Sequence, residues 1–364
     1  GHGSGRGPAG SVPGRRPAGQ EGKDRIRGLV DPDRLGQWMD AEGLPGSGEK
    51  VQATFVTGGA SNELFEIQRG EHRWALRRPP RMVPEGRNET MLREYRILRA
   101  LADSNVPHPA VRAVCAEPSV LGATFYLMDF VDGWSPISES HWPEPFDSDP
   151  GARRGLAFEL VDAIARLSRV DWKARGLEGL GRPDGFHDRQ VDRWYAPLRQ
   201  FEFRKIPGLD EAGDWLRGHR PRNYQPGIMH GDYQFANVMF HHGGPARLAA
   251  IVDWEMGTVG DPLLDLAWVV MGWPDEGEVR TGGYVDYTGM PNRDDLLDHY
   301  ASVSGRDVDD IDYYVVLARF KLAIVLEGGY ARYVAGRADN PRMEAFGGVV
   351  LDLAARAAEL VRTI

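Results

Sequence analysis

The sequence predicts an α+β protein with a small antiparallel-sheet lobe followed by a larger, mainly helical lobe. Two observations predict this order. Short β-type runs separated by glycine turns dominate from Val51 to Val131, whereas apolar residues after Gly133 mostly recur at helical spacing. The chain has 364 residues, enough for two domains or one two-lobed unit, and 41% hydrophobic residues to build its core.

The first lobe is expected at residues 29–130, after a tail at 1–28. The tail is rich in Gly, Pro and Arg and has no apolar period, which predicts a flexible segment; a nucleic-acid-binding arm is the alternative. Within the lobe the pattern predicts one helix and five strands, at 88–102 and at 51–57, 63–69, 72–78, 111–116 and 124–131. The last of these strands is almost wholly apolar, so we expect it in the interior of the sheet.

The second lobe is expected at residues 131–364. Helical spacing predicts helices at 152–168, 188–203, 210–218, 262–271, 294–302, 310–333 and 343–362. Short apolar runs among them predict a small stranded patch at 227–229, 238–240 and 248–252.

Composition narrows the function classes. The net charge is −9, although the first 30 residues carry an excess of Lys and Arg, so the body of the chain is more acidic still. An acidic body argues against nucleic-acid binding and suits neutral or cationic partners. The single cysteine, Cys115, excludes an intramolecular disulfide, and no apolar run approaches the ~20 residues of a membrane span. We therefore expect a cytoplasmic protein without a membrane partner.

The strongest functional signal is the stretch Ile-Met-His-Gly-Asp-Tyr-Gln-Phe-Ala-Asn-Val at residues 228–238. Asp232 is followed five residues later by Asn237, and Asp253 ends a later apolar run, Ile251-Val252-Asp253. In phosphoryl transfer an Asp accepts or orients the proton of the attacking hydroxyl, while an Asn and a second Asp hold Mg²⁺ against nucleotide phosphates. The alternative is a pair of loops with turn-forming Asp residues, but the complete combination favours the catalytic interpretation.

These motifs resemble the aminoglycoside phosphotransferase / choline kinase-like family. The resemblance covers roughly residues 29–364 and implies a protein-kinase-like fold with a five-stranded sheet in its first lobe. It implies that ATP and Mg²⁺ are the cofactors and that the γ-phosphoryl group goes to a hydroxyl of a small molecule. By the same resemblance, Asp232 is the base, and Asn237 and Asp253 hold the metal.

The resemblance also assigns nucleotide-binding residues in the first lobe. The turn Gly58-Gly59-Ala60-Ser61-Asn62 resembles the family's Gly-Gly-x-Ser-Asn turn over the phosphates, where glycines allow close backbone approach. Arg77 stands where the protein-kinase pattern has Lys, and Arg78 is the second choice because it points to the opposite face. Glu94 is expected to orient this cation, with Glu89 as its competitor.

Two further segments resemble parts of the family. Asp129 and Val131 are the expected hinge, through the Asp129 carbonyl and the Val131 N–H as adenine partners. In Gly260–Trp268, we expect Asp261 and Asp265 to cap and brace the catalytic loop, as structural supports and not as ligands. His230 is expected to hold this loop through a backbone hydrogen bond.

No motif in the sequence identifies the acceptor. The family implies aminoglycosides, whereas Leu76-Arg77-Arg78-Pro79-Pro80 and Arg93-Glu94-Tyr95 more closely resemble a subgroup that includes kinase-like domains fused to acyl-CoA dehydrogenases. That subgroup is associated with hydroxyacyl-CoA acceptors. The alternative from another class is a non-catalytic, nucleotide-binding module with a kinase fold, for which Arg77 in place of Lys is the support.

Overall fold

The computed structural model describes residues 26, 28–58, 62–137, 141–201, 204–275, 278, 285–338 and 340–364. Most of the expected tail, and Gly59, Ala60 and Ser61 of the phosphate turn, lie outside the described residues. The chain forms two compact units. The first comprises the described residues up to Leu92 together with Val111–Phe130, and the second comprises Arg93–Ala110 and Val131–Ile364. Residues 93–110, which the sequence pattern placed in the first lobe, therefore group with the second unit.

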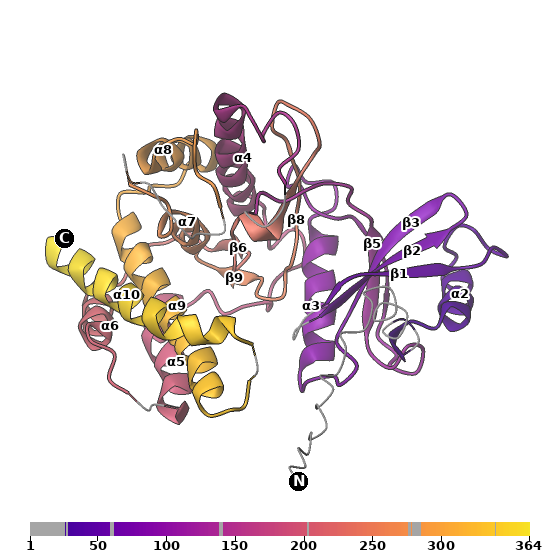
Figure 1. Ribbon diagram of the computed structural model, residues 1–364, viewed down its shortest axis with the longest axis horizontal. Coiled ribbons are helices and arrows are strands. Elements are labelled where there is room, and N and C mark those ends of the chain that lie inside the picture. Colours follow the sequence, from indigo (N-terminus) through magenta and orange to yellow (C-terminus); the bar gives the residue numbers. More distant parts are fainter. Residues whose placement is uncertain are drawn as a thin grey trace, which may run out of the picture. The chain divides into compact units, whose positions relative to one another are not determined.

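The first unit is built on a five-stranded antiparallel sheet with the strand order β1-β2-β3-β5-β4 (Figure 1). Its strands are β1 (Gln52–Gly58), β2 (Glu63–Arg69), β3 (His72–Arg78), β4 (Val111–Cys115) and β5 (Phe125–Asp129). The interior position of β5 agrees with its apolar sequence, because a strand with neighbours on both sides and a covered face has little contact with water. The sequence prediction of the sheet is confirmed.

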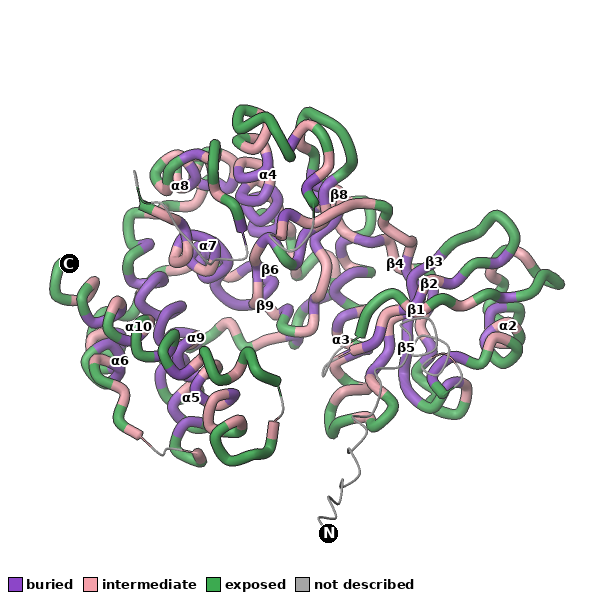
Figure 2. The backbone as a smooth tube through the Cα atoms, in the orientation of Figure 1, coloured by how far each residue is buried: buried purple, intermediate pink, exposed green. Residues whose placement is uncertain are grey.

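One face of this sheet carries a hydrophobic core. Alternate residues Phe65 and Ile67 of β2 are fully buried and share this core with Leu35 and Met39 of α2 (Pro32–Ala41). Figure 2 colours the buried parts of the backbone purple. The helix α2 was not predicted from the sequence. Its start signal was readable, since Asp31 accepts hydrogen bonds from the Asp33 and Arg34 amides and Pro32 occupies the first helical position.

The helix α3 (Arg87–Ala100) runs across the division between the units, which falls after Leu92. The second unit then contains the helices α4 (Pro150–Ser168), α5 (Phe186–Phe201), α6 (Leu209–Gly218), α7 (Leu263–Val270), α8 (Arg293–Ser304), α9 (Ile311–Val334) and α10 (Arg342–Thr363). These helices agree with the predicted ones to within a few residues at either end, because their apolar residues keep a helical period.

The centre of the second unit is α9. It packs against α5, α6, α7 and α10 (Figure 1), and the side chains from Val315 to Ala318 are buried in an uninterrupted run. This central helix also carries charged side chains: Arg319 and Glu327 are buried, and Lys321 is partly buried.

Two short antiparallel pairs hold the loops of the second unit. β6 (Gly227–Met229) pairs with β9 (Thr258–Gly260), and β7 (Val238–Phe240) pairs with β8 (Leu248–Ile251). A single 3₁₀ turn, η1 (Phe235–Asn237), precedes β7. The three residues of β9 were not predicted, because so short a strand has no period of its own. Among the described residues, no helix combines the length and apolar character that crossing a membrane requires.

Candidate active site

The loop between β6 and β7 carries His230, Gly231 and Asp232. Gly231 has φ of 91°, and a Cβ atom there would lie 2.6 Å from the Met256 carbonyl oxygen. Any side chain would therefore be strained by its backbone conformation and would also meet fixed backbone. Glycine before Asp232 is a requirement of this loop and not only a feature of its sequence.

Asp265 of α7 holds the start of the loop through hydrogen bonds to its backbone. Its carboxylate accepts the N–H of His230 at 2.7 Å and the N–H of Gly231 at 3.0 Å. The side chain is buried, and this burial raises the pKa of Asp265, while the two amides and the positive charge of Lys321 favour its ionised form. The expectation that Asp265 braces the loop is confirmed.

Both ring nitrogens of His230 are occupied by the backbone. Nε2 lies 2.8 Å from the carbonyl oxygen of Val252, to which it must donate, and Nδ1 accepts the N–H of Asp232 at 3.2 Å. These partners define the neutral imidazole with its proton on Nε2. His230 therefore links the loop to the residue that follows β8, and it has no lone pair available to act as a base.

The Asp232 carboxylate is held from two sides. Oδ1 accepts a hydrogen bond from Gln234 Nε2 at 2.9 Å, and Oδ2 accepts one from Asn237 Nδ2 at 3.2 Å. Asn237 Nδ2 also donates to the Asp232 carbonyl oxygen at 2.7 Å. The NH₂ group of Asn237 therefore donates to Asp232. The side-chain oxygen of Asn237 remains as a potential metal ligand.

Asp253 lies next to Asn237 because the backbone joins them. The Val252 N–H donates to the Asn237 carbonyl oxygen at 2.9 Å, which extends the β7–β8 pair by one step. Asp253 itself has φ of 61°, an uncommon conformation for a residue with a side chain that tends to occur at functional sites. An amide oxygen and a carboxylate are hard oxygen donors, so this pair fits Mg²⁺.

Lys321 of α9 is a site residue that the sequence analysis missed. Its Nζ donates to the Gly231 carbonyl oxygen at 3.3 Å and lies over the rings of Trp194 and Trp268, at 4.9 and 5.0 Å from their centroids. Burial lowers the pKa of Lys321 to about 8, and the charges of Asp232 and Asp265 oppose that change. The sequence signal was weak, because Lys321 shares α9 with other charged residues such as Arg319 and Glu327.

A cavity of about 220 Å³ opens beside Asp232. Its walls are mostly apolar and aromatic, and they include Leu160, Phe235, Trp268, Trp273 and Tyr287. The rings of Trp273 and Tyr287 pack edge to face with centroids 4.9 Å apart. Among the described residues that line this cavity, Asp232 is the only acidic one.

The predicted nucleotide residues of the first unit lie on or beside its sheet. Gly58 ends β1, Asn62 precedes β2, and Arg77 of β3 is partly buried opposite Leu64 and Tyr126. Asp129 at the end of β5 forms a two-pronged ion pair with Arg112, at 2.7 and 2.6 Å.

Arg78 has a structural role in the first unit. Its buried guanidinium donates to the carbonyl oxygens of Leu29, Pro79 and Leu121, and burial lowers the pKa of Arg78 to about 10. These bonds occupy the side chain, which leaves Arg77 as the candidate phosphate ligand on β3. The remaining predicted residues, Glu94 and Val131, belong to the second unit, where Glu94 is fully buried in α3.

The sheet of the first unit and the helical second unit with its Asp–Asn–Asp loops define a protein-kinase-like phosphotransferase fold. The profile of the phosphotransferase enzyme family, APH, matches residues 52–297, and the chain belongs to this family.

The similar proteins include one that is much longer than this chain and one of comparable length. Acyl-CoA dehydrogenase family member 11 of Gallus gallus is 30% identical over 317 residues, which are 84% of this chain and 40% of that protein. This chain therefore spans about two fifths of that relative. A putative aminoglycoside phosphotransferase from Ralstonia eutropha JMP134 is 29% identical, with a TM-score of 0.78 over 91% of this chain and 98% of the other.

A third comparison concerns the fold alone. Spectinomycin phosphotransferase APH(9)-Ia, solved in complex with ADP and spectinomycin, is 12% identical, with a TM-score of 0.56 over 91% of this chain and 99% of that one.

Proposed function

We propose that this protein transfers the γ-phosphoryl group of ATP to a hydroxyl group of a small-molecule acceptor. The observation that carries the proposal is the convergence of Asp232, Asn237 and Asp253 on two adjoining loops in a member of a phosphotransferase family. The likeness to the ADP complex of spectinomycin phosphotransferase supports the same class of nucleotide.

Asp232 is the group that acts on the acceptor. One carboxylate oxygen takes the proton of the attacking hydroxyl, while the amides of Gln234 and Asn237 restrict the rotation of the carboxylate. Asn237 and Asp253 would hold Mg²⁺, which neutralises the charge of the phosphates when it is bound. Lys321 and Asp265 hold Gly231 from its carbonyl and its amide, and thereby set the direction in which Asp232 points.

The nucleotide is proposed to bind through the first unit and the adjoining hinge. The turn Gly58–Asn62 covers the phosphates, Arg77 contacts them, and Glu94 orients that guanidinium. The Asp129 carbonyl and the Val131 N–H bind adenine. Arginine in place of lysine keeps the positive charge and adds a planar fork, so this departure is compatible with catalysis.

The cavity beside Asp232 favours an apolar acceptor over an aminoglycoside. A polycation needs several carboxylates around it, but the described lining supplies only Asp232, which the reaction itself uses. Aromatic and aliphatic walls suit a hydroxyl carried on a hydrocarbon chain. A hydroxyacyl thioester such as a hydroxyacyl-CoA has this character, and the name of the Gallus gallus relative points to the same chemistry.

The test is ADP release from Mg-ATP with a panel of acceptors. The panel contains hydroxyacyl-CoA esters, the matching acyl-CoA esters without the hydroxyl, aminoglycosides, amino alcohols and sugars. We expect release only with the hydroxylated esters, and its loss in Asp232→Asn. Binding of Mg-ATP without release for any acceptor would instead support a nucleotide-binding module without catalysis.

A further inference from the structure

A second cavity of the helical unit, of about 650 Å³, is lined by guanidinium groups. Arg93 comes from α3, Arg189 and Arg193 come from α5, and Arg182 comes from the segment before α5. Glu255 is the only acidic residue in the described lining. The chain as a whole has a net charge of −9, whereas the lining of this cavity has an excess of positive charge.

None of these four arginines forms an ion pair with a described carboxylate. Arg93 Nε donates to the Gly257 carbonyl oxygen at 3.2 Å, and Arg189 donates to the Asp184 carbonyl oxygen at 2.7 Å. The Arg193 guanidinium lies over the Trp194 ring, 5.4 Å from its centroid. These contacts fix the side chains but do not neutralise their charge.

The positive charges also act on one another. Burial lowers the pKa of Arg93, and the neighbouring charges of Arg193 and Arg96 lower it further. Guanidinium groups that repel one another around a cavity are stabilised when an anion enters. Arginine forks bind phosphate groups through paired hydrogen bonds, so phosphate is the anion that suits them best.

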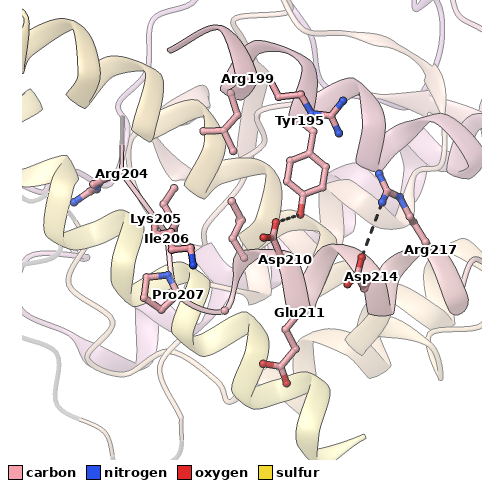
Figure 3. A pocket seen from close by; sticks show the side chains of 13 residues that line it. Tyr195, Arg199, Arg204, Lys205, Ile206, Pro207, Asp210, Glu211, Asp214 and Arg217 are labelled. Carbon is pink, nitrogen blue, oxygen red and sulfur yellow. Dashed lines mark hydrogen bonds and ion pairs between the residues drawn. The ribbon is translucent and has the colours of Figure 1, made fainter. Parts of the chain in front are cut away.

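A larger cavity, which is also lined by residues of α5, has positive and negative side chains in similar numbers. It measures about 710 Å³ and is lined by Arg199, Arg204, Lys205 and Arg217, but also by Asp210, Glu211 and Asp214 (Figure 3). Arg204 is paired with Glu327 at 2.8 Å, and Arg217 is paired with Asp192 at 2.5 Å. Because carboxylates offset these cations, this cavity has no comparable excess of positive charge.

The arginine-lined cavity adjoins the catalytic loop. Met256 lines the cavity, and its carbonyl packs so closely on Gly231 that no Cβ atom would fit between them. Arg193 is followed by Trp194, whose ring contacts the ammonium group of Lys321. A ligand in this cavity would therefore lie in the same unit as Asp232 and would contact Met256, the residue whose carbonyl packs on the catalytic loop.

We propose that this cavity, lined by Arg93, Arg182, Arg189 and Arg193, is a subsite for phosphate groups carried by the acceptor of the reaction proposed above. The acceptor then has two different ends. A hydroxyl on an apolar chain reaches Asp232, and a part that bears phosphate groups binds the arginines. A coenzyme A thioester has both, whereas an aminoglycoside has neither the apolar chain nor the phosphates.

The test measures binding without turnover, so that it does not depend on the proposed reaction. The probe is adenosine 3′,5′-bisphosphate, titrated by calorimetry in the presence of saturating Mg-AMP-PNP, which occupies the nucleotide site. The variant is Arg193→Glu, because Arg193 is exposed and its contact within the described part of the chain is with the Trp194 ring. The control is Arg199→Glu, an exposed arginine of the same helix that lies over the Tyr195 ring in the larger cavity.

We expect Arg193→Glu to weaken the probe by about tenfold or more, since it removes a charged hydrogen bond and adds a repulsive charge. Arg199→Glu should bind like the wild type. Equal weakening in both variants would mean a general charge effect and would overturn the proposal. Displacement of the probe by AMP-PNP would overturn it as well, because the phosphates would then belong to the nucleotide site.

Kinetics separate this proposal from the proposed function. With an active acceptor, Arg193→Glu should raise the KM of the acceptor and leave the KM of ATP unchanged. Probe binding that is lost in Arg193→Glu, in a protein that phosphorylates none of the panel, would support the subsite and count against the reaction. Turnover with an unchanged acceptor KM in Arg193→Glu would support the reaction and exclude the subsite.

Discussion

Asp261 and Asp265 are both buried and stand four residues apart, yet they support two different regions. Asp265 accepts hydrogen bonds from backbone amides of the catalytic loop. Asp261 accepts one from the Tyr314 hydroxyl at 2.6 Å, lies 2.8 Å from His187 Nε2, and accepts the Leu263 N–H at 3.1 Å. Asp265 therefore positions a reactive carboxylate, whereas Asp261 ties α5 and α9 to the start of α7.

The difference shows that a buried carboxylate is assigned a role by its partners and not by its burial or its motif. From the sequence alone, both residues were expected to cap and brace the loop. The structure confirms a supporting role for both residues, but only Asp265 has described hydrogen bonds to the loop, whereas Asp261 caps the start of α7. Mutations in the two regions should accordingly separate turnover from stability.

The largest effect on turnover is expected for Asp232→Asn. The amide cannot take the proton of the acceptor hydroxyl, so kcat should fall by about 10³-fold or more. The midpoint of thermal unfolding should stay close to that of the wild type, because Asp232 is not part of a core. ADP release and calorimetric unfolding of the same preparations check both statements, and turnover within tenfold of wild type would refute the assignment.

Asp265→Asn should have the next largest effect. An amide can accept one of the two loop N–H groups but presents its own donor to the other, so the loop shifts. Misplacement of Asp232 should lower kcat by roughly 10- to 100-fold, with a smaller change in the KM of ATP. Steady-state kinetics with Asp261→Asn as the matched control would show whether the loss depends on contact with the loop.

Lys321→Met should lower kcat by about tenfold, because Gly231 loses its carbonyl partner and Asp232 loses a neighbouring positive charge. The pKa of Lys321 adds a dependence on pH. Its ammonium loses its proton as pH rises through about 8, so wild-type kcat should decline above that value. The Met variant has no such group and should lack this decline, while Lys321→Arg should keep its activity to higher pH. Identical pH profiles for all three proteins would remove Lys321 from the mechanism.

Asp261→Asn is expected to change turnover least. It weakens a buried bond to Tyr314 and disturbs His187, so the free energy of unfolding should fall by about 2 kcal/mol. Turnover per folded molecule should remain within about threefold of the wild type, since the catalytic loop keeps its own partners. Urea unfolding and kinetics together test this contrast, and a loss of kcat as large as that of Asp265→Asn would contradict it.

The sequence predicted those parts that repeat a local pattern. The strands of the sheet and the long helices could be predicted from the periodic spacing of their apolar residues. The Asp–Asn–Asp set could be predicted from the spacing of its members in the sequence. Contacts made between distant segments could not be predicted in this way. Lys321 lies 89 positions beyond Asp232 and carries no motif, while the arginine-lined cavity combines α3, α5 and the segment after β8. Net charge does not describe how charge is distributed, since an acidic chain can still place several arginines around one cavity.

Because Lys321 lies against the rings of Trp194 and Trp268, the intrinsic fluorescence of these tryptophans should report on its position. A cation held against an indole ring affects its excited state, and a ligand that draws the ammonium group away should change the emission of these two tryptophans. Acceptors that react slowly, or not at all, can therefore be ranked by fluorescence titration without a label. Trp194→Phe and Trp268→Phe would show which ring reports the event.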